Sequence, residues 1–231
     1  MNKQIGHQDF NLASAAALAG PLDFAADQAL AASTSNLTFR VLKRWFDIVI
    51  TLCALPFVGA IAAILLLLNP LWNPGPLLFL QTRMGRDCKP FRAVKFRTMR
   101  PAERIRRGPD DPLEADRITP LGHVLRRSRF DELPQFLNVL AGEMSVIGPR
   151  PDFWNHAKHY LRTVPGYRQR HTVRPGITGL AQVDGGYAEG VDATLEKTRL
   201  DLRYLRAGSF AMETYILSRT VVVLLTGFGA R

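Results

Sequence analysis

Two adjacent acidic residues, Asp131 and Glu132, follow three arginines, Arg126, Arg127 and Arg129. A carboxylate pair among cations suits chemistry on phosphates, because one carboxylate can attack phosphorus while the other holds Mg²⁺. Arginine side chains can hold phosphate oxygens through paired hydrogen bonds. The pair also suits a structural role, with Asp131 as the N-cap of a helix and Glu132 in its first turn. Asp131 and Glu132 are therefore candidate catalytic residues, and Arg126 is a candidate phosphate ligand.

Two proline-containing turns supply further cations. Arg150 lies within the run Gly-Pro-Arg-Pro at residues 148–151, and Arg174 begins the run Arg-Pro-Gly-Ile-Thr-Gly at residues 174–179. Proline restricts its own backbone and that of the preceding residue, so each turn holds its arginine in a limited range of positions. Neither run has the spacing of a nucleotide-binding P-loop, which excludes that class of phosphate site. Arg150 and Arg174 are therefore candidate ligands for substrate phosphates.

The net charge is +10 and is distributed unevenly along the chain. Residues 1–39 contain one lysine and three aspartates, a net charge of −2, so residues 40–231 carry +12. Such an excess favours anionic partners, namely phosphorylated substrates, anionic lipid headgroups or nucleic acid. The basic run at residues 100–107 has no interleaved aromatic residues and no recognition helix, which argues against nucleic acid.

A long uncharged segment predicts an element embedded in a membrane. Residues 48–82 contain no charged side chain, and residues 48–68 are almost continuously apolar. That apolar stretch has about the 20 residues that a helix needs to cross a bilayer. Trp45 and Trp72 flank it, and tryptophan prefers the boundary between water and hydrocarbon.

The flanks and one proline leave two topologies open for this segment. Basic residues stand on both sides of it, which favours the cytoplasm for both flanks. Pro56 lies in the middle, where it removes a helical hydrogen bond and bends the backbone. A re-entrant helix that breaks at Pro56 and returns to the same face satisfies both features. A single kinked helix that crosses the membrane is the alternative.

The remaining elements are inferred from hydrophobic periodicity. An apolar run at residues 77–81 and an alternating run at residues 91–98 predict a small β-hairpin, with its turn at residues 85–87. Helices are expected at residues 121–127, 131–140, 153–162, 192–206 and 209–225. The last of these is apolar at its end and suits either the membrane interface or the core. The expected fold is mostly helical α+β, with a mobile tail (1–39), a membrane-embedded segment (40–75) and a cytoplasmic catalytic domain with amphipathic interfacial helices (76–231).

Together these segments resemble the bacterial sugar transferases, the monotopic polyprenyl-phosphate phosphoglycosyl transferases, in their small single-domain form. The resemblance covers residues 43–227. It rests on five runs in order: Lys-Arg-Trp-Phe-Asp at 43–47, Lys-Phe-Arg-Thr-Met at 95–99, Asp-Glu-Leu-Pro-Gln at 131–135, Gly-Glu-Met-Ser-Val-Ile-Gly-Pro-Arg-Pro at 142–151, and Arg-Pro-Gly-Ile-Thr-Gly at 174–179. One run alone indicates little, whereas all five in this order are very specific.

The resemblance implies transfer of a sugar-1-phosphate from a nucleotide diphosphate sugar, expected to be a UDP-sugar, to polyprenyl (undecaprenyl) phosphate. This step would initiate the synthesis of an exopolysaccharide, a capsule or an O-antigen. Asp131 would be the nucleophile that forms a covalent phosphosugar intermediate, and Glu132 would bind the required Mg²⁺. The resemblance also implies contacts between the substrate phosphates and five cations, Lys95, Arg97, Arg126, Arg150 and Arg174.

The resemblance also favours the re-entrant topology at Pro56, which places the active site on the cytoplasmic face of the bacterial inner membrane, among membrane lipids. One departure from the family pattern keeps an alternative open. The family usually has Asn-Gly-Arg where this chain has Asp184, Gly185 and Gly186, so a cation expected near the nucleotide phosphates is absent. The alternative is a catalytically impaired relative that acts as a membrane scaffold in polysaccharide assembly.

Overall fold

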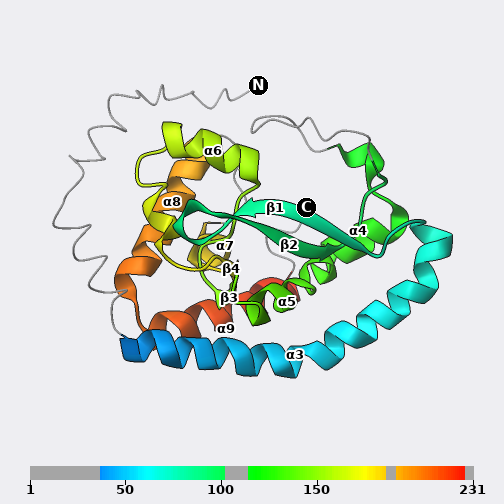
Figure 1. Cartoon of the computed structure of the whole chain (residues 1–231), viewed down its shortest axis with the longest axis horizontal. Coiled ribbons are helices and arrows are strands. Elements are labelled where there is room, and N and C mark those ends of the chain that lie inside the picture. Colours follow the sequence, from blue (N-terminus) through cyan, green and yellow to red (C-terminus); the bar gives the residue numbers. More distant parts are fainter. Residues whose placement is uncertain (1–36, 102–113, 186–190, 227–231) are drawn as a thin grey trace, which may run out of the picture.

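The computed structural model describes residues 37–101, 114–185 and 191–226. It is mostly helical, with two small two-stranded sheets. The expected tail lies almost wholly outside the described residues. In Figure 1 one long helix runs along an edge of the molecule, and the other elements are gathered on one side of it.

That long helix, α3 (Leu37–Trp72), has 36 residues and confirms the expected apolar element. Within the described part of the chain it is the one helix that is long and apolar enough to cross a membrane. Its buried residues form a stripe with helical spacing, whereas large apolar side chains on its other faces are exposed. The helix is continuous through Pro56 instead of breaking there, and Figure 1 shows it bending along its length. A missing proline N–H explains such a bend.

The first turns of α3 are tied to the rest of the domain by charged residues. The buried Asp47 carboxylate accepts hydrogen bonds from Ser145 Oγ and the Val146 N–H, both at 2.9 Å. Arg44 donates to the backbone carbonyls of Val139, at 2.7 Å, and Leu140, at 3.1 Å. The run Lys-Arg-Trp-Phe-Asp therefore positions α3 against the segment that carries the candidate site.

The predicted β-hairpin is confirmed as an antiparallel pair, β1 (Leu78–Met84) and β2 (Pro90–Phe96). Its turn contains the 3₁₀ element η1 (Arg86–Cys88), in which Asp87 and Cys88 adopt φ of 56° and 55°. A strand pairing that was not expected joins β3 (Ser145–Ile147) to β4 (Gly176–Thr178) in parallel. Strands of three residues are too short to show an alternating pattern, so the sequence gives no sign of them.

The β3–β4 pairing brings the two proline-containing turns side by side. The Gly148 N–H donates to the Thr178 carbonyl at 2.8 Å, and the Gly176 N–H donates to the Pro149 carbonyl at 3.0 Å. The backbones approach so closely that a Cβ on Gly176 would lie 2.1 Å from the Gly148 nitrogen. The glycines at this junction are therefore required by packing, and the turn with Arg150 is supported by the turn with Arg174.

Most of the expected helices are confirmed within a residue or two. The structure has α4 (Pro120–Arg127), α5 (Gln135–Leu140), α6 (Trp154–Thr163), α7 (Leu180–Asp184), α8 (Val191–Ala207) and α9 (Phe210–Thr226), with short 3₁₀ turns η2 (Ala115–Arg117), η3 (Phe130–Glu132) and η4 (Gln169–Thr172). The helix expected at residues 131–140 is wrong in its first half. Asp131 lies in the turn η3, and α5 begins only after Pro134. Asp131 is therefore not a helix N-cap.

The C-terminal helix α9 lies beside the first turns of α3 (Figure 1). Lys43 forms an ion pair of 2.6 Å with Glu213, and the rings of Phe39 and Phe210 are 5.0 Å apart. Ile216 of α9 belongs to the main hydrophobic core, which gathers residues of β2, α5, β3, α7 and α8. Other apolar side chains of α9 are exposed: Phe210, Val221, Val222 and Leu224. The helix thus contributes both to the core and to an apolar surface.

The neutral form of His171 is built into the fold. The side chain is only 4% exposed, and its Nδ1 lies 3.2 Å from the Gly85 carbonyl, to which it must donate. Its Nε2 is buried without a hydrogen-bond partner. Burial, helped by the charge of Arg170, lowers the pKa of His171 from 6.5 to about 3.

We expect His171 to make stability depend on pH. Between pH 6.5 and about 3 the unfolded chain binds a proton that the folded chain excludes, so stability falls as the pH is lowered through this range. The loss at about pH 5 should be about 2 kcal/mol. Melting temperatures at about pH 7 and pH 5 should therefore converge in His171→Gln. The exposed His123→Gln should keep the wild-type difference; an unchanged difference in His171→Gln would refute this assignment.

Candidate active site

Three separate parts of the chain meet at the Glu132 carboxylate. Lys95, on β2, donates to Oε1 at 2.6 Å. Arg150, in the turn after β3, contacts both carboxylate oxygens, with its Nη1 at 2.8 Å from Oε2 and its Nη2 hydrogen-bonded to Oε1. Glu132 itself is presented by the turn η3. The structure therefore brings together three candidate residues, of which the residue pattern itself predicts Glu132 and Arg150, and the family resemblance implies Lys95.

Burial and the neighbouring charges together shift the pKa values of Glu132 and Lys95. Burial alone would raise the pKa of Glu132, but Arg150 and Lys95 outweigh it and hold that pKa well below its usual range. Burial lowers the pKa of Lys95 from 10.5 to about 8, although Glu132 opposes the shift. Glu132 is thus a fixed anion between two cations.

Asp131 lies beside this cluster, but its carboxylate does not take part in the ion pairs. Its side chain is buried, with 9% of the residue exposed, and within the described ranges no hydrogen bond ends on its carboxylate. Burial raises its pKa, reinforced by Glu132, while Lys95, Arg150 and Arg126 act to lower it. The Asp131 side chain is therefore without a hydrogen-bond partner among the described residues, and it lies near cations that can attract an anion.

Two further predicted phosphate ligands, Arg126 and Arg97, differ in how close they lie to the carboxylate pair. Arg126 lies close enough for its charge to act on Asp131, and its Nη2 is 3.7 Å from the Met99 sulfur. Arg97 is buried and donates to backbone carbonyls, that of Pro76 at 2.7 Å, that of Met99 at 3.3 Å and that of Asn73. Arg97 thus holds the segment after α3 against the strand, and its contact with substrate phosphates stays a prediction.

Arg174 lies in a separate electrostatic environment. Its Nε donates to the Gly142 carbonyl at 2.7 Å. Burial lowers its pKa, and the charges that act on it most strongly are those of Arg44, Arg86, Asp47 and Arg40. The charges that act most strongly on Asp131 are those of Lys95, Glu132, Arg150 and Arg126. The structure therefore does not bring Arg174 to the carboxylate pair.

The carboxylate pair fits a magnesium ion that takes most of its ligands from water and substrate. No group of three or more His, Cys, Asp and Glu residues that could enclose a metal is found among the described residues. Mg²⁺ commonly uses one or two carboxylates together with waters and phosphate oxygens. Asp131 is free to contribute, whereas Glu132 would have to exchange one of its contacts with Lys95 or Arg150 for the metal.

Sequence reasoning missed the residues that hold Arg150 in place. Arg83 donates to the Pro151 carbonyl, and the fully buried Arg170 donates to the Arg150 carbonyl at 2.7 Å. Arg170 is also paired with two carboxylates, Asp152 and Asp201, at 2.6 and 2.7 Å. Nothing in the local sequence distinguishes these arginines from solvated ones, because their partners lie far along the chain.

A family model described as bacterial sugar transferase matches residues 38–227. The UDP-N-acetylgalactosamine-undecaprenyl-phosphate N-acetylgalactosaminephosphotransferase of Aeromonas hydrophila is 41% identical over 194 residues, which are 84% of this chain and 46% of that protein. The UDP-glucose:undecaprenyl-phosphate glucose-1-phosphate transferase of Escherichia coli (strain K12) is 39% identical over 184 residues, 79% of this chain and 40% of that protein.

A third relative is similar in length to the chain. The exopolysaccharide production protein PSS of Rhizobium leguminosarum bv. phaseoli is 43% identical over 196 residues, which are 80% of this chain and 96% of that protein. The chain thus spans less than half the length of the first two relatives, and it matches nearly the whole of the third.

Proposed function

Because the chain belongs to the bacterial sugar transferase family, we propose that it transfers a sugar-1-phosphate from a UDP-sugar to undecaprenyl phosphate. The names of the Aeromonas and Escherichia relatives support this pair of substrates. The name of the Rhizobium relative supports a role in exopolysaccharide production. The observation that carries the proposal is the buried, unbonded Asp131 carboxylate beside an anion that two cations hold in place.

The proposed reaction has two displacements at one phosphorus atom. An Asp131 carboxylate oxygen attacks the phosphorus bonded to the sugar, and the bond from that phosphorus to the bridging oxygen breaks, releasing UMP. An oxygen of undecaprenyl phosphate then attacks the same phosphorus. The aspartyl–phosphorus bond breaks, and Asp131 returns to its carboxylate form. The product is an undecaprenyl diphosphosugar.

The cations and Glu132 have distinct parts in this reaction. Lys95 and Arg150 stabilise negative charge near the phosphates, so that an anionic nucleophile can approach an anionic donor. Glu132 fixes the position of both cations through its ion pairs. A Mg²⁺ ion, when bound by Glu132 and the substrate phosphates, would supply further charge neutralisation and polarise the phosphoryl oxygens.

We further propose that α3 is re-entrant and returns to the cytoplasmic face of the bacterial inner membrane. The bend of the helix, its exposed apolar faces and the exposed apolar side chains of α9 support this topology. Single cysteines at Leu37 and Trp72 in sealed inverted vesicles test it. A membrane-impermeant maleimide should label both positions from the cytoplasmic side; labelling of only one would indicate a spanning helix.

The transfer itself is tested with purified protein, radiolabelled UDP-sugars, undecaprenyl phosphate and Mg²⁺. We expect label to move into the lipid fraction with at least one sugar and UMP to be released. A scaffold without activity would give no lipid-linked label with any sugar. The motivation for that alternative, Gly186, lies outside the described residues, so this assay decides between the two functions.

A further inference from the structure

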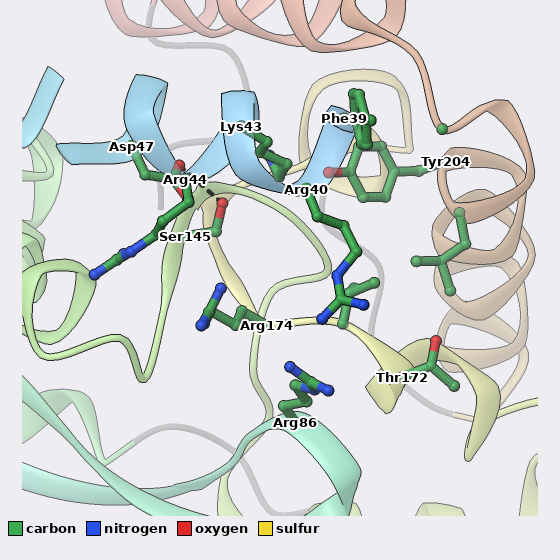
Figure 2. Close-up of a pocket in the computed structure, with 13 residues that line it drawn as sticks. Phe39, Arg40, Lys43, Arg44, Asp47, Arg86, Ser145, Thr172, Arg174 and Tyr204 are labelled. Atoms are coloured by element: carbon green, nitrogen blue, oxygen red, sulfur yellow. Dashed lines mark hydrogen bonds between the residues drawn. The ribbon is translucent and has the colours of Figure 1, made fainter. Parts of the chain in front are cut away.

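A cavity of about 350 Å³ lies between the first turns of α3, the hairpin turn and the segment before β4. It is lined by five cations, Arg40, Lys43, Arg44, Arg86 and Arg174. Asp47 is the one acidic residue in its lining. Figure 2 shows Arg40 and Arg86 reaching into the same space from opposite sides, with Arg174 beside them. Three separate parts of the chain thus direct guanidinium groups to one place.

Most of this positive charge is not neutralised by the protein. Lys43 is paired with Glu213 at 2.6 Å. Asp47 is buried and already accepts two hydrogen bonds that anchor α3. Among the salt bridges formed within the described ranges, none involves Arg40, Arg44 or Arg174.

The hydrogen-bond and ion-pair partners of the arginines in the cavity neutralise little of their positive charge. Arg44 and Arg174 donate to backbone carbonyls, which do not neutralise a cation. Within the described part of the chain, the ion pair of the Arg86 side chain is a 3.4 Å contact with its exposed neighbour Asp87. Burial and the like charges of Arg44, Arg86 and Arg40 lower the pKa of Arg174. The cavity therefore places cations together at an energetic cost that a bound anion would relieve.

The cavity is also distinct from the active site. None of Lys95, Asp131, Glu132 and Arg150 lines it. The position of the cavity on α3 indicates where it lies relative to a membrane. Arg40 and Arg44 are four residues apart, so they share the face of the helix that lines the cavity. Leu42 and Trp45, in the same turns, are exposed apolar side chains. If the apolar side of α3 contacts lipid, the cavity lies beside the end of the helix, near the depth of the headgroups.

We propose that this cavity binds the phosphate group of an anion that is separate from the sugar donor held at Asp131. Arginine side chains suit phosphate because each can offer two parallel N–H donors. The phosphate can belong to an anionic phospholipid headgroup or to a soluble diphosphate. In either case the bound phosphate contacts arginines from the start of α3, from the hairpin turn and from the turn that begins at Arg174. It therefore stabilises the packing of α3 against the rest of the domain.

The test compares two probes on the purified full-length chain in zwitterionic detergent without Mg²⁺. Sodium pyrophosphate represents the soluble source, and short-chain phosphatidylglycerol represents the lipid, with short-chain phosphatidylcholine as its neutral counterpart. Isothermal titration calorimetry gives the affinity for each probe. We expect saturable binding of pyrophosphate, phosphatidylglycerol or both, weakened by NaCl, and no comparable binding of phosphatidylcholine.

The variant that tests the site is Arg40→Gln with Arg86→Gln, because both side chains are exposed and their loss leaves the core intact. It should weaken binding by at least about tenfold. The matched control, Arg162→Gln with Arg199→Gln, removes two exposed arginines outside the cavity and should change the affinity less than about twofold. Asp131→Asn should bind as the wild type does.

The probe that binds the wild type and loses affinity in the variant Arg40→Gln with Arg86→Gln identifies the source of the phosphate. The proposal is overturned if neither probe binds saturably, or if the cavity variant retains wild-type affinity. It is equally overturned if the control variant loses as much affinity as the cavity variant, since binding would then reflect net charge alone. A loss of pocket binding in Asp131→Asn would place the anion in the active site instead.

Discussion

Replacing Asp131 with asparagine should reduce sugar-phosphate transfer by at least about a thousandfold, because the amide cannot act as the nucleophile. The substitution preserves the size of the side chain. It removes no hydrogen bond, since none ends on the Asp131 carboxylate within the described residues. Burial also favours the neutral side chain. We therefore expect Asp131→Asn to fold normally and to retain its melting temperature.

Two measurements check the role of Asp131. The first is the rate of UMP release without and with undecaprenyl phosphate; a covalent mechanism releases UMP in a burst before acceptor is added. The second is the mass of acid-quenched protein, which should show one added sugar phosphate in the wild type and none in Asp131→Asn. Glu114→Gln, which changes a half-buried acid paired with Arg117, is the control. Near-normal turnover in Asp131→Asn would show that another group attacks phosphorus.

Three of the candidate residues that lie together in the structure share one property: their positions are set by neighbours in sequence or by rigid turns. Asp131 and Glu132 are adjacent, and the prolines around Arg150 fix its turn. The structure adds contacts between residues that are far apart in the sequence. Arg170 and Arg83 donate hydrogen bonds to the turn that carries Arg150, and Lys95 forms an ion pair with Glu132.

The positions of Arg97 and Arg174 depend on backbone geometry that residue types do not encode, and their contacts with substrate phosphates stay predictions. The guanidinium of Arg97 is drawn to the carbonyls at the end of α3, which become available only once that helix has ended beside the strand. Arg174 is two residues from β4, and its side chain is directed to the cavity near α3. A basic residue in a conspicuous motif can thus serve the fold, a second site or the reaction, and only the partners distinguish these roles.

The expected helix at residues 131–140 failed for a local reason. Its apolar spacing is helical, but Pro134 lacks an N–H, and Arg129 adopts a left-handed φ of 58° just before the acidic pair. These features place the pair in a tight 3₁₀ turn. The turn carries Glu132 to Lys95 and Arg150 while leaving Asp131 unbonded, an arrangement that a regular helix start would not give.

Replacing Glu132 with glutamine should lower the transfer rate by at least about a hundredfold and weaken the response to Mg²⁺. The amide has a single acceptor oxygen and no charge, so it cannot neutralise Lys95 and Arg150 together. Both cations can then pair with the Asp131 carboxylate, which ties up the nucleophile that the wild type leaves free. Metal affinity falls as well if Glu132 is a ligand.

Titrating the rate with Mg²⁺ separates the two contributions of Glu132. A lower maximal rate together with a higher half-saturating Mg²⁺ concentration would indicate both roles. A lower maximal rate with an unchanged titration curve would reject metal binding and leave Glu132 as the anion that keeps two cations off the nucleophile. Glu196→Gln, at an exposed acid of α8, is the control and should match the wild type in both respects. In either outcome we expect Glu132 to keep Asp131 unbonded, because the two cations proposed to bind the substrate would otherwise pair with the carboxylate proposed to attack it.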